Sequence, residues 1–281
     1  MTSTSQDLFL LQNAVWVLTS RTDNPGYDFE FDRFFECRRP WEHPPAQNVV
    51  ARIGPIGDYP AQYNELHAAG ITLINTPHDH ERASELSSWY PLLSDLTPQT
   101  VVYAAPPPAA EVEAKFGWPV FVKGVRQTAR HAAALSVARS AREYEALARA
   151  YSENPILHWQ PCAVRAFVDL ERVGRSDGVH LPPAFEFRTF WSKSNLLGAG
   201  RYWTEASYAW TDLEKAQALA VARQAAERLT VPFLVIDMAR TAAGKWIVIE
   251  CNDGQESGYA GVSPFEVWSN LCELSHEYTQ T

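Results

Sequence analysis

The sequence lacks three signatures that would each assign a chemistry at once. It contains no G-x-x-x-x-G-K-[ST] phosphate loop, no G-x-G-x-x-G dinucleotide fingerprint and no G-x-S-x-G nucleophile elbow. The run Gly54-Pro-Ile-Gly57 is too short for a dinucleotide loop and is typical of a turn. We therefore set aside P-loop hydrolysis, Rossmann-type dinucleotide binding and elbow-type hydrolase chemistry.

Cysteine is scarce and scattered. The four cysteines are Cys37, Cys162, Cys251 and Cys272. They form no C-x-x-C pair and have no histidine at metal-ligand spacing, which is typical of reduced thiols rather than of a disulfide frame or a zinc site. His78 and His80 flank Asp79, but such residues usually decorate a helix start, so we do not interpret them as a metal site.

Long apolar runs and an excess of positive charge are also missing. No run approaches the ~20 apolar residues that cross a bilayer, and the first residues lack the basic region and cleavage site of a secretory signal. The chain has 24 Lys and Arg against 33 Asp and Glu, a net charge of −9. Such a chain repels phosphate backbones on average, although a local basic pocket for one nucleotide remains compatible with it. We therefore expect a cytoplasmic protein that binds neither membranes nor nucleic acid in general.

Aromatic and apolar residues are abundant, and the first part of the chain alternates between strand-like and helix-like segments. Hydrophobic residues make up 46% of the 281, enough for one large domain or two modest ones. We expect strands at 15–18, 48–53 and 71–75 and helices at 61–69 and 79–93. Gly70 is a suitable residue after the first helix, and Pro91 should kink or end the second. The pattern predicts an α/β domain over residues 1–96 with a largely parallel sheet.

The pattern changes after the prolines between residues 97 and 108. We expect helices at 109–116, 141–151, 212–229 and 264–278, and strands at 120–123, 156–160, 185–191, 196–203, 233–238 and 245–250. Thr211 or Asp212 can cap the longest helix. Strands joined by short turns, with the helices kept separate, predict an α+β unit over residues 97–281.

A β-hairpin near the C-terminus carries the most informative pattern. Two β-rich runs flank a tight turn in which Gly244 supplies a positive φ. If Ala243 and Gly244 form the loop, Asp237 lies directly opposite Glu250. Asn252 follows Glu250 by two residues and shares its face. Three oxygen-bearing side chains are therefore predicted to converge.

The two opposed carboxylates need a positive partner. They repel each other across the sheet, and the apolar neighbours Phe233, Val235 and Val248 on that face add a desolvation penalty. A hard divalent cation relieves both effects, and two carboxylates with an amide oxygen suit Mg²⁺. The alternative is a hairpin whose acidic residues point to solvent, but apolar residues fill both faces around them.

Three cations are candidates for binding the phosphates of a magnesium nucleotide, which require positive partners. Lys123 ends an apolar strand, Arg188 shares a strand face with Glu186, and Arg201 follows a run of small and apolar residues. Each has an alternative role. Lys123 would snorkel to solvent, and Arg188 would pair with the carboxylate of Glu186.

Taken together, these motifs resemble the ATP-grasp superfamily over about residues 48–265. Residues 116–124 resemble the strand whose lysine touches the nucleotide phosphates, residues 164–170 the hinge strand that contacts adenine through its backbone, and the hairpin the D…E-x-N metal trio. The resemblance implies an ATP-grasp fold with a small N-terminal α/β (pre-ATP-grasp) domain. It implies that Mg²⁺ is held by Asp237, Glu250 and Asn252, and that ATP is held by Lys123, Arg165, Ala166, Phe167, Val168 and Asp169.

Within the superfamily, the chain resembles the divergent clade named for two arginines and a lysine, which includes a eukaryotic translation-initiation assembly factor of the cell-division-cycle group. This resemblance implies that Arg188 and Arg201 are the catalytic arginines that contact phosphates. It gives Arg130 a second basic position on the loop after Lys123, where the clade often has lysine. The chain departs from the pattern in lacking a Gly-rich loop between residues 124 and 132 and in the long insertion at 171–183.

The superfamily resemblance implies a carboxylate–amine ligase. ATP would phosphorylate a carboxylate to an acyl phosphate, which an amine or similar nucleophile of a small molecule or peptide then attacks, and residues 253–261 are expected to contact the substrate. Three alternatives stay open: an ATP-binding assembly factor without turnover, a kinase with a hydroxyl acceptor, and a nucleic-acid end-joining enzyme that releases AMP. The last agrees poorly with the charge of −9.

Overall fold

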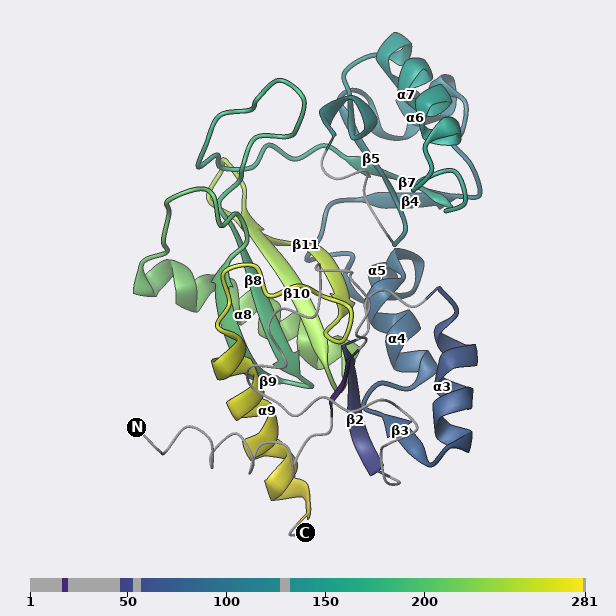
Figure 1. The fold of residues 1–281 in the computed structure, drawn as a ribbon. Helices are drawn as coiled ribbons and strands as arrows, with labels where there is room; N and C mark the ends of the chain where they lie inside the picture. The colour runs from purple at the N-terminus through teal and green to yellow at the C-terminus, as the bar shows by residue number, and fades with distance from the viewer. Residues whose placement is uncertain (1–16, 20–45, 53–56, 127–131, 280–281) are drawn as a thin grey trace.

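The computed structural model describes residues 17–19, 46–52, 57–126 and 132–279, and Figure 1 shows them as three sheets with helices packed around them. The first sheet contains β1 (Val17–Thr19), β2 (Ala46–Arg52) and β3 (Ile71–Leu73). Its strands are parallel, in the order β1-β2-β3, as predicted for this part of the chain. Helix α3 (Tyr59–Ala68) packs against it through Tyr59 and Leu66, and Gly70 follows with a φ of 84°.

The second sheet is small and antiparallel. Its strands are β4 (Thr100–Tyr103), β5 (Val120–Gly124), β6 (Val137–Ala138) and β7 (Cys162–Ala166), in the order β4-β7-β5-β6. The accompanying helices are α6 (Ala109–Phe116), the short 3-10 helix η2 (Ala133–Leu135) and α7 (Ala141–Glu153). Valines of β5 and tyrosines of α7 share one buried cluster, so this unit has its own core.

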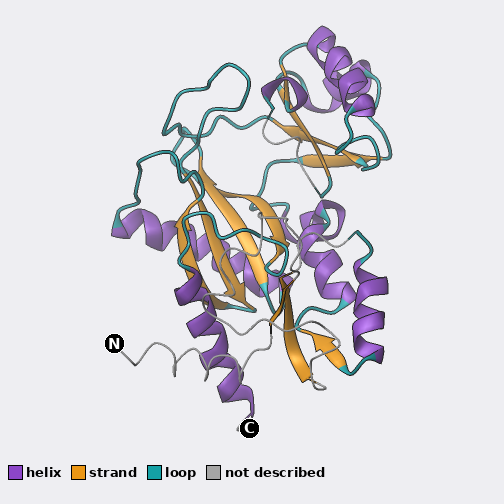
Figure 2. Ribbon diagram, in the orientation of Figure 1, coloured by secondary structure: helices purple, strands orange, loops and turns teal. Residues whose placement is uncertain are grey.

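The third sheet forms the centre of the molecule (Figure 2). Its strands are β8 (Glu186–Ser192), β9 (Asn195–Arg201), β10 (Leu234–Arg240) and β11 (Trp246–Asp253), antiparallel in the order β11-β10-β8-β9. The predicted α+β character is confirmed. Leu234, Ile236 and Met238 pack with the alanines of α8 (Asp212–Leu229), whereas Phe233 and Val235 pack with α9 (Pro264–Thr279). Period-two alternation thus gives each face of the sheet its own helix.

The predicted helix over residues 79–93 is wrong in one respect, because the chain forms two helices there, α4 (Pro77–Ser84) and α5 (Leu86–Leu93). The break lies at Glu85, with φ −90° and ψ 114°, whereas Pro91 lies inside α5. The N–H of Leu86 donates to the carbonyl of Val125 at 3.2 Å instead of to a helical carbonyl. A contact with a distant part of the chain therefore sets the break.

The predicted strand at residues 156–160 is also wrong, since this stretch is a series of turns. The side chain of Asn154 accepts hydrogen bonds from the N–H groups of Ile156 (2.9 Å) and Leu157 (3.2 Å). Such local side-chain acceptors stabilise turns at the expense of strands. Leu157 is buried in the core cluster of the small sheet and Ile156 packs against that cluster, but neither residue belongs to a strand.

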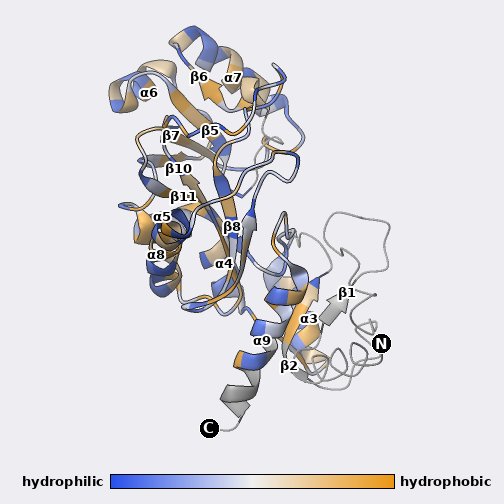
Figure 3. Ribbon diagram, turned by 90° about the vertical axis from the view of Figure 1, so that its left-hand side faces the viewer, coloured by the Kyte–Doolittle hydropathy of each residue, from blue (hydrophilic) through white to orange (hydrophobic). Residues whose placement is uncertain are grey.

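The hydropathy of the ribbon agrees with this arrangement (Figure 3). Hydrophobic residues colour much of the strands, whereas hydrophilic and hydrophobic residues alternate along the helices. Among the described residues, no helix combines the length and the apolar composition that a membrane span requires.

Candidate functional site

Asp237 and Glu250 lie opposite each other across strands β10 and β11, as the sequence predicts. The turn that joins the strands is one residue longer than predicted. The N–H of Thr241 donates to the carbonyl of Lys245 at 2.8 Å, which leaves three residues in the loop. Gly244 has a φ of 85°, so its predicted positive φ is confirmed.

A β-bulge at Ile249 offsets the longer turn. Met238 pairs with Val248, and the next pair along the ladder is Asp237 with Glu250, so Ile249 is the extra residue. The bulge restores the predicted pairing of the carboxylates. It also turns Val248 into the cluster beneath α8, so the prediction that Val248 shares the face of Glu250 is wrong.

Arg188 holds the carboxylate of Asp237 in a two-pronged ion pair. Its Nε and Nη2 donate to Asp237 Oδ1 and Oδ2 at 2.8 and 2.7 Å, across the register pair between β8 and β10. Nη1 donates to the carbonyl of Gly258 at 2.7 Å, and the guanidinium lies 5.0 Å from the ring of Tyr202. Burial lowers the pKa of Arg188, but Asp237 outweighs it and raises the pKa above its ordinary value. Asp237 is therefore the partner of Arg188, and the alternative pairing with Glu186 is wrong.

Lys123 forms an ion pair with Glu250 that connects the small sheet to the central one. The lysine side chain is only 4% exposed, so it does not snorkel to solvent. Burial raises the pKa of Glu250, but the charge and hydrogen bond of Lys123, together with the charge of Arg188, outweigh burial and hold the pKa below its ordinary value. Asn252 also hydrogen-bonds Glu250 and is partly exposed.

Three members of these ion pairs, Lys123, Glu250 and Asp237, line a pocket between the two sheets. Eight of the predicted site residues line it: Lys123, Arg165, Ala166, Phe167, Val168, Asp169, Asp237 and Glu250. The remaining lining is largely apolar and includes Phe121, Val137, Leu181, Pro182, Ile247 and Ile249. A pocket that combines a largely apolar lining with several charged groups suits a flat base joined to phosphates.

The side chain of Arg165 is occupied by protein groups. It donates to Thr97 Oγ1, to Thr100 Oγ1 at 3.1 Å and to the carbonyl of Ile249 at 2.9 Å. Burial lowers its pKa to about 10. The predicted contact of this segment with adenine runs through the backbone, and the engaged side chain is consistent with that.

A family model matches residues 74–271, more than half of the chain. It describes the ATP-grasp domain of family 3 in the clade named for two arginines and a lysine. The chain belongs to this family. The fold is accordingly the ATP-grasp fold, with the central and small sheets facing each other across the pocket. No curated protein matches the chain.

Three solved structures are similar to this ATP-grasp chain over nearly its whole length. The D-alanine–D-alanine ligase from Bacillus anthracis, complexed with ATP, has a TM-score of 0.62 at 10% identity and covers 95% of this chain and 98% of its own. A RimK domain ATP-grasp protein from Sphaerobacter thermophilus has a TM-score of 0.60 at 13% identity, with coverage of 93% and 99%. The ATP-grasp ligase PsnB, complexed with minimal precursor, Mg and ADP, has a TM-score of 0.56 at 14% identity, with coverage of 95% and 99%. At such identities the likeness supports the shared fold.

One of the predicted cations, Arg201, lies outside the residues that line the pocket. Arg201 is exposed and lies opposite Phe187 in the register of strands β8 and β9. Phe187 belongs to the buried cluster beneath α8. Arg188 lies opposite Gly200, on the other face of the sheet. The role of Arg201 stays a prediction. Arg130 falls outside the described residues.

The ATP-grasp pocket is also lined by charged and aromatic residues that the sequence reasoning did not assign to it, among them Phe121, Arg139, Arg172, Glu186, Tyr202 and Trp203. The Nε1 of Trp203 donates to Glu186 Oε2 at 3.0 Å, and burial raises the pKa of Glu186 to about 8. The signal for Glu186 was its predicted position on the same strand face as Arg188. The two side chains do share this face, but the sequence suggested for Glu186 only the role of an ion-pair partner of Arg188.

The donor set of the pocket fits a divalent cation. Two of its carboxylates, Asp237 and Glu250, are paired with the cations Arg188 and Lys123, and a third carboxyl group, Glu186, lies on the same strand face as Arg188. Burial raises the pKa of Asp237 even beside Arg188. Among the described residues, no three His, Cys, Asp or Glu side chains converge in a preformed metal cluster. The predicted trio contains only two carboxylates and completes its ligands with an amide, as Mg²⁺ accepts.

Proposed function

We propose that the chain is a Mg·ATP-dependent ligase, which activates a carboxylate as an acyl phosphate for attack by an amine or similar nucleophile. The observation that carries this proposal is the pair of ion pairs, Lys123–Glu250 and Arg188–Asp237, at the wall of the pocket. Lys123 and Arg188, the proposed phosphate-binding cations, already contact Glu250 and Asp237, the carboxylates that would bind the metal. Membership of the ATP-grasp family supports the same chemistry.

The nucleotide would lie with its base against the apolar lining of the pocket and its phosphates beside the charged groups. Phe121, Val137 and Ile247 supply apolar walls for the base. The backbone of residues 165–169 supplies hydrogen-bonding groups at its edge. Lys123 and Arg188 would then exchange their carboxylate partners for phosphate oxygens, because cations form strong charge-assisted hydrogen bonds to phosphate.

Asp237, Glu250 and Asn252 would hold Mg²⁺, which neutralises charge on the phosphates when bound. The exchange of partners supports this assignment, since it frees both carboxylates as oxygen donors. Without a cation, two freed carboxylates in a buried site would repel each other.

The proposed reaction needs no covalent nucleophile from the chain. A carboxylate oxygen of the substrate attacks the γ-phosphorus, the bond to the bridging oxygen breaks, and ADP leaves. The amine then attacks the acyl carbon, and inorganic phosphate leaves. Arg188 would stabilise the charge that develops on the transferred phosphoryl group, with Arg201 and Arg130 as further proposed cations.

The substrate is proposed at the level of class. Structural neighbours include a ligase for D-alanine and a ligase complexed with a precursor peptide, so an amino acid or peptide carboxylate is the class to test first. Residues 253–261, our proposed substrate-contacting loop, reach the phosphate site because the carbonyl of Gly258 accepts from Arg188.

Thermal unfolding without nucleotide, with ATP plus EDTA and with Mg·ATP tests nucleotide binding. Ligand at ~100 times its dissociation constant adds about 2.7 kcal/mol of stability, which corresponds to a rise of roughly 5–10 °C for a chain near this size. We expect that rise with Mg·ATP and its loss in Glu250→Gln. Glu227→Gln, at an exposed position on α8, is the matched control and should keep it. An unchanged midpoint in every condition would remove the basis of the proposal.

Trapping with hydroxylamine tests the acyl phosphate itself. With Mg·ATP and a pool of amino acids and short peptides, the ligase hypothesis predicts a hydroxamate together with ADP. Phosphorylation of a hydroxyl group without hydroxamate would assign the chain as a kinase. Tight ATP binding without release of ADP would favour an assembly factor.

A further inference from the structure

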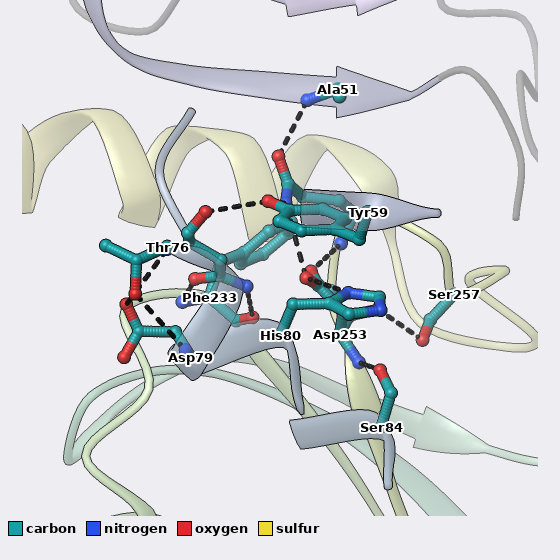
Figure 4. Close-up of polar contacts among 12 residues, drawn as sticks. Ala51, Tyr59, Thr76, Asp79, His80, Ser84, Phe233, Asp253 and Ser257 are labelled. Atoms are coloured by element: carbon teal, nitrogen blue, oxygen red, sulfur yellow. Dashed lines mark hydrogen bonds and ion pairs between the residues drawn. The ribbon is translucent and has the colours of Figure 1, made fainter. Parts of the chain in front are cut away.

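The segment Asp253–Gly258, here called the anchor loop, begins at the last residue of strand β11 and is held by buried polar contacts (Figure 4). Its Asp253 and Gln255 side chains are fully buried, and Ser257 is nearly so. Within the loop, Asp253 Oδ1 accepts from the N–H of Gln255 at 2.8 Å. A polar loop that is buried to this extent depends on partners from elsewhere in the fold.

Strand β2 of the N-terminal sheet supplies the first set of partners. The Nη1 of Arg52, a fully buried residue, donates to the carbonyls of Gly254, Gln255 and Ser257 at 2.9, 3.2 and 2.7 Å. The N–H of Ala51 donates to Gln255 Oε1 at 2.9 Å. One guanidinium thus fixes three carbonyls of the same loop, which sets the path of its backbone.

Helix α4 supplies the second set. His80 Nδ1 lies 3.1 Å from Asp253 Oδ2, and because a carboxylate only accepts, the imidazole donates this hydrogen bond. The ring of His80 stacks on Tyr59 with centroids 4.0 Å apart, and Ser84 Oγ accepts from the N–H of Asp253 at 3.1 Å. Burial lowers the pKa of His80, but the hydrogen bond and charge of Asp253 outweigh it and raise the pKa above its ordinary value.

The other side of the anchor loop faces the phosphate site. The carbonyl of Gly258 accepts from Arg188 Nη1, and the residue before the loop is Asn252, the proposed amide ligand of the metal. The distance from Gly258 O to Arg188 Nη1 is 2.7 Å. The loop therefore connects two residues from the N-terminal part of the chain to the guanidinium at the phosphates.

We propose that Arg52 and His80 are positioning residues for phosphoryl transfer: they fix the anchor loop, and its Gly258 carbonyl aims Arg188 at the terminal phosphate of ATP. This inference rests on the proposed function, because it takes Arg188 as a phosphate ligand. It gives strand β2 and helix α4 a part in recognising the γ-phosphate without contact with the nucleotide.

Two variants at one position separate the hydrogen bond from the bulk of the side chain. His80→Leu keeps apolar volume beside Tyr59 but removes the donor to Asp253. His80→Asn keeps a donor near the position of Nδ1 but removes the ring. Ile71→Val, in the core of the N-terminal sheet away from the loop, is the control for a loss of stability alone. Arg52→Lys, which retains the charge but not the fork of donors, serves as a second variant if His80→Leu does not fold.

Two readouts are needed, and both are measured at a temperature well below the midpoint of thermal unfolding. Calorimetric titration gives the dissociation constants of Mg·ATP and Mg·ADP, whose ratio reports on contacts with the terminal phosphate. Hydrogen exchange of the free protein reports on the amides of residues 253–258. For His80→Leu we expect faster exchange in the loop and a preference for ATP over ADP reduced about fivefold, the weight of one hydrogen bond. His80→Asn and Ile71→Val should resemble the wild type in both.

Faster exchange in His80→Leu with an unchanged ATP-to-ADP ratio would overturn the inference while leaving the proposed function standing. So would an equal fall of the ratio in Ile71→Val, since stability alone would then explain it. A wild type that binds neither nucleotide would overturn the proposed function, and the positioning role with it.

Discussion

At the scale of single residues, Glu186 is a carboxyl group that folding holds in its protonated form. It is 6% exposed, and burial raises its pKa from 4.5 to about 8. Because the folded pKa exceeds the unfolded value, the carboxyl destabilises the fold progressively as the pH rises from about 4.5 towards 8. The hydrogen bond from Trp203 persists over this range but does not offset the loss of hydration.

Glu186→Gln is expected to relieve this penalty, because glutamine resembles the protonated carboxyl and still accepts from Trp203. Urea unfolding in EDTA should show nearly equal stability of variant and wild type at pH 5. At pH 8 the variant should be more stable by at least ~1 kcal/mol. The control Glu227→Gln should show no such dependence. A difference that is the same at both pH values would contradict the raised pKa.

Single residues were predicted best where sequence spacing alone fixes the geometry. The pairing of Asp237 with Glu250 follows from strand register. The burial of Lys123 was not predicted, since a lysine that ends a strand was expected to emerge from it. The choice of partners could not be predicted, because it depends on how separate sheets meet. Lys123 reaches Glu250 from another sheet, and Arg188 selects Asp237 over Glu186 by its place in the ladder.

At the scale of elements, the hairpin was predicted correctly at its centre and incorrectly at its turn. Two-residue loops are the commonest hairpin connections, which favoured the shorter turn. The extra residue of the loop and the extra residue of the bulge cancel before Asp237 is reached. Neither extra residue can be recognised in the sequence, because Ile249 looks like an ordinary apolar residue of a strand.

Strand β9 and the loop that follows Gly258 approach each other too closely for a side chain. A Cβ on Gly200 would lie 2.2 Å from the carbonyl oxygen of Gly261. Since the atoms that it would meet are backbone, Gly200→Ala is expected to destabilise the protein by about 1–3 kcal/mol and to weaken Mg·ATP binding through the displaced loop. Urea unfolding and calorimetry measure the two effects.

Gly57→Ala is the matched control for Gly200→Ala, because a Cβ at Gly57 meets nothing within 4 Å. Its stability should stay within about 0.5 kcal/mol of the wild type. If Gly200→Ala were equally silent, the close approach of β9 and the loop would not persist in solution.

At the scale of the whole molecule, the boundary predicted at residue 96 stays a prediction, but the packing points to an earlier division. Helices α4 and α5 belong to the buried cluster of the central sheet through Ala83, Leu86, Trp89 and Leu93. Arg82 also donates to the carbonyl of Arg228 at the end of α8, at 2.8 Å. We therefore propose that the N-terminal unit ends near residue 74, where the family match begins. Sequence periodicity could not show this, because it indicates which face of a helix is buried but not which sheet that face packs against.

The long segment at residues 171–184 belongs to the connection from the small sheet to the central sheet (Figure 1), and it contributes Arg172, Leu181, Pro182 and Ala184 to the pocket. The exposed Arg172 and Arg175 are cleavage sites for trypsin. Bound Mg·ATP should order this segment and slow cleavage at both arginines by roughly tenfold, because open states become rarer when ligand binds the closed form.

Mass spectrometry of timed digests measures this protection, and ATP with EDTA is the control. Unchanged cleavage at Arg172 and Arg175, together with a raised unfolding midpoint, would show that the nucleotide binds without engaging the segment.

The three hydrogen bonds of Arg165 also determine how the molecule can move. Its guanidinium joins strand β7 of the small sheet to the carbonyl of Ile249 in the central sheet, next to Glu250. Thr97, in the connection between the two units, donates to the carbonyl of Val248 at 2.9 Å. Because the sheets are joined at this point, we expect the small unit to rotate about it rather than to slide. Motion is then expected to be smallest near Glu250, a proposed metal ligand, and largest at the outer helices α6 and α7, which would let substrates enter and leave while the proposed site stays in place.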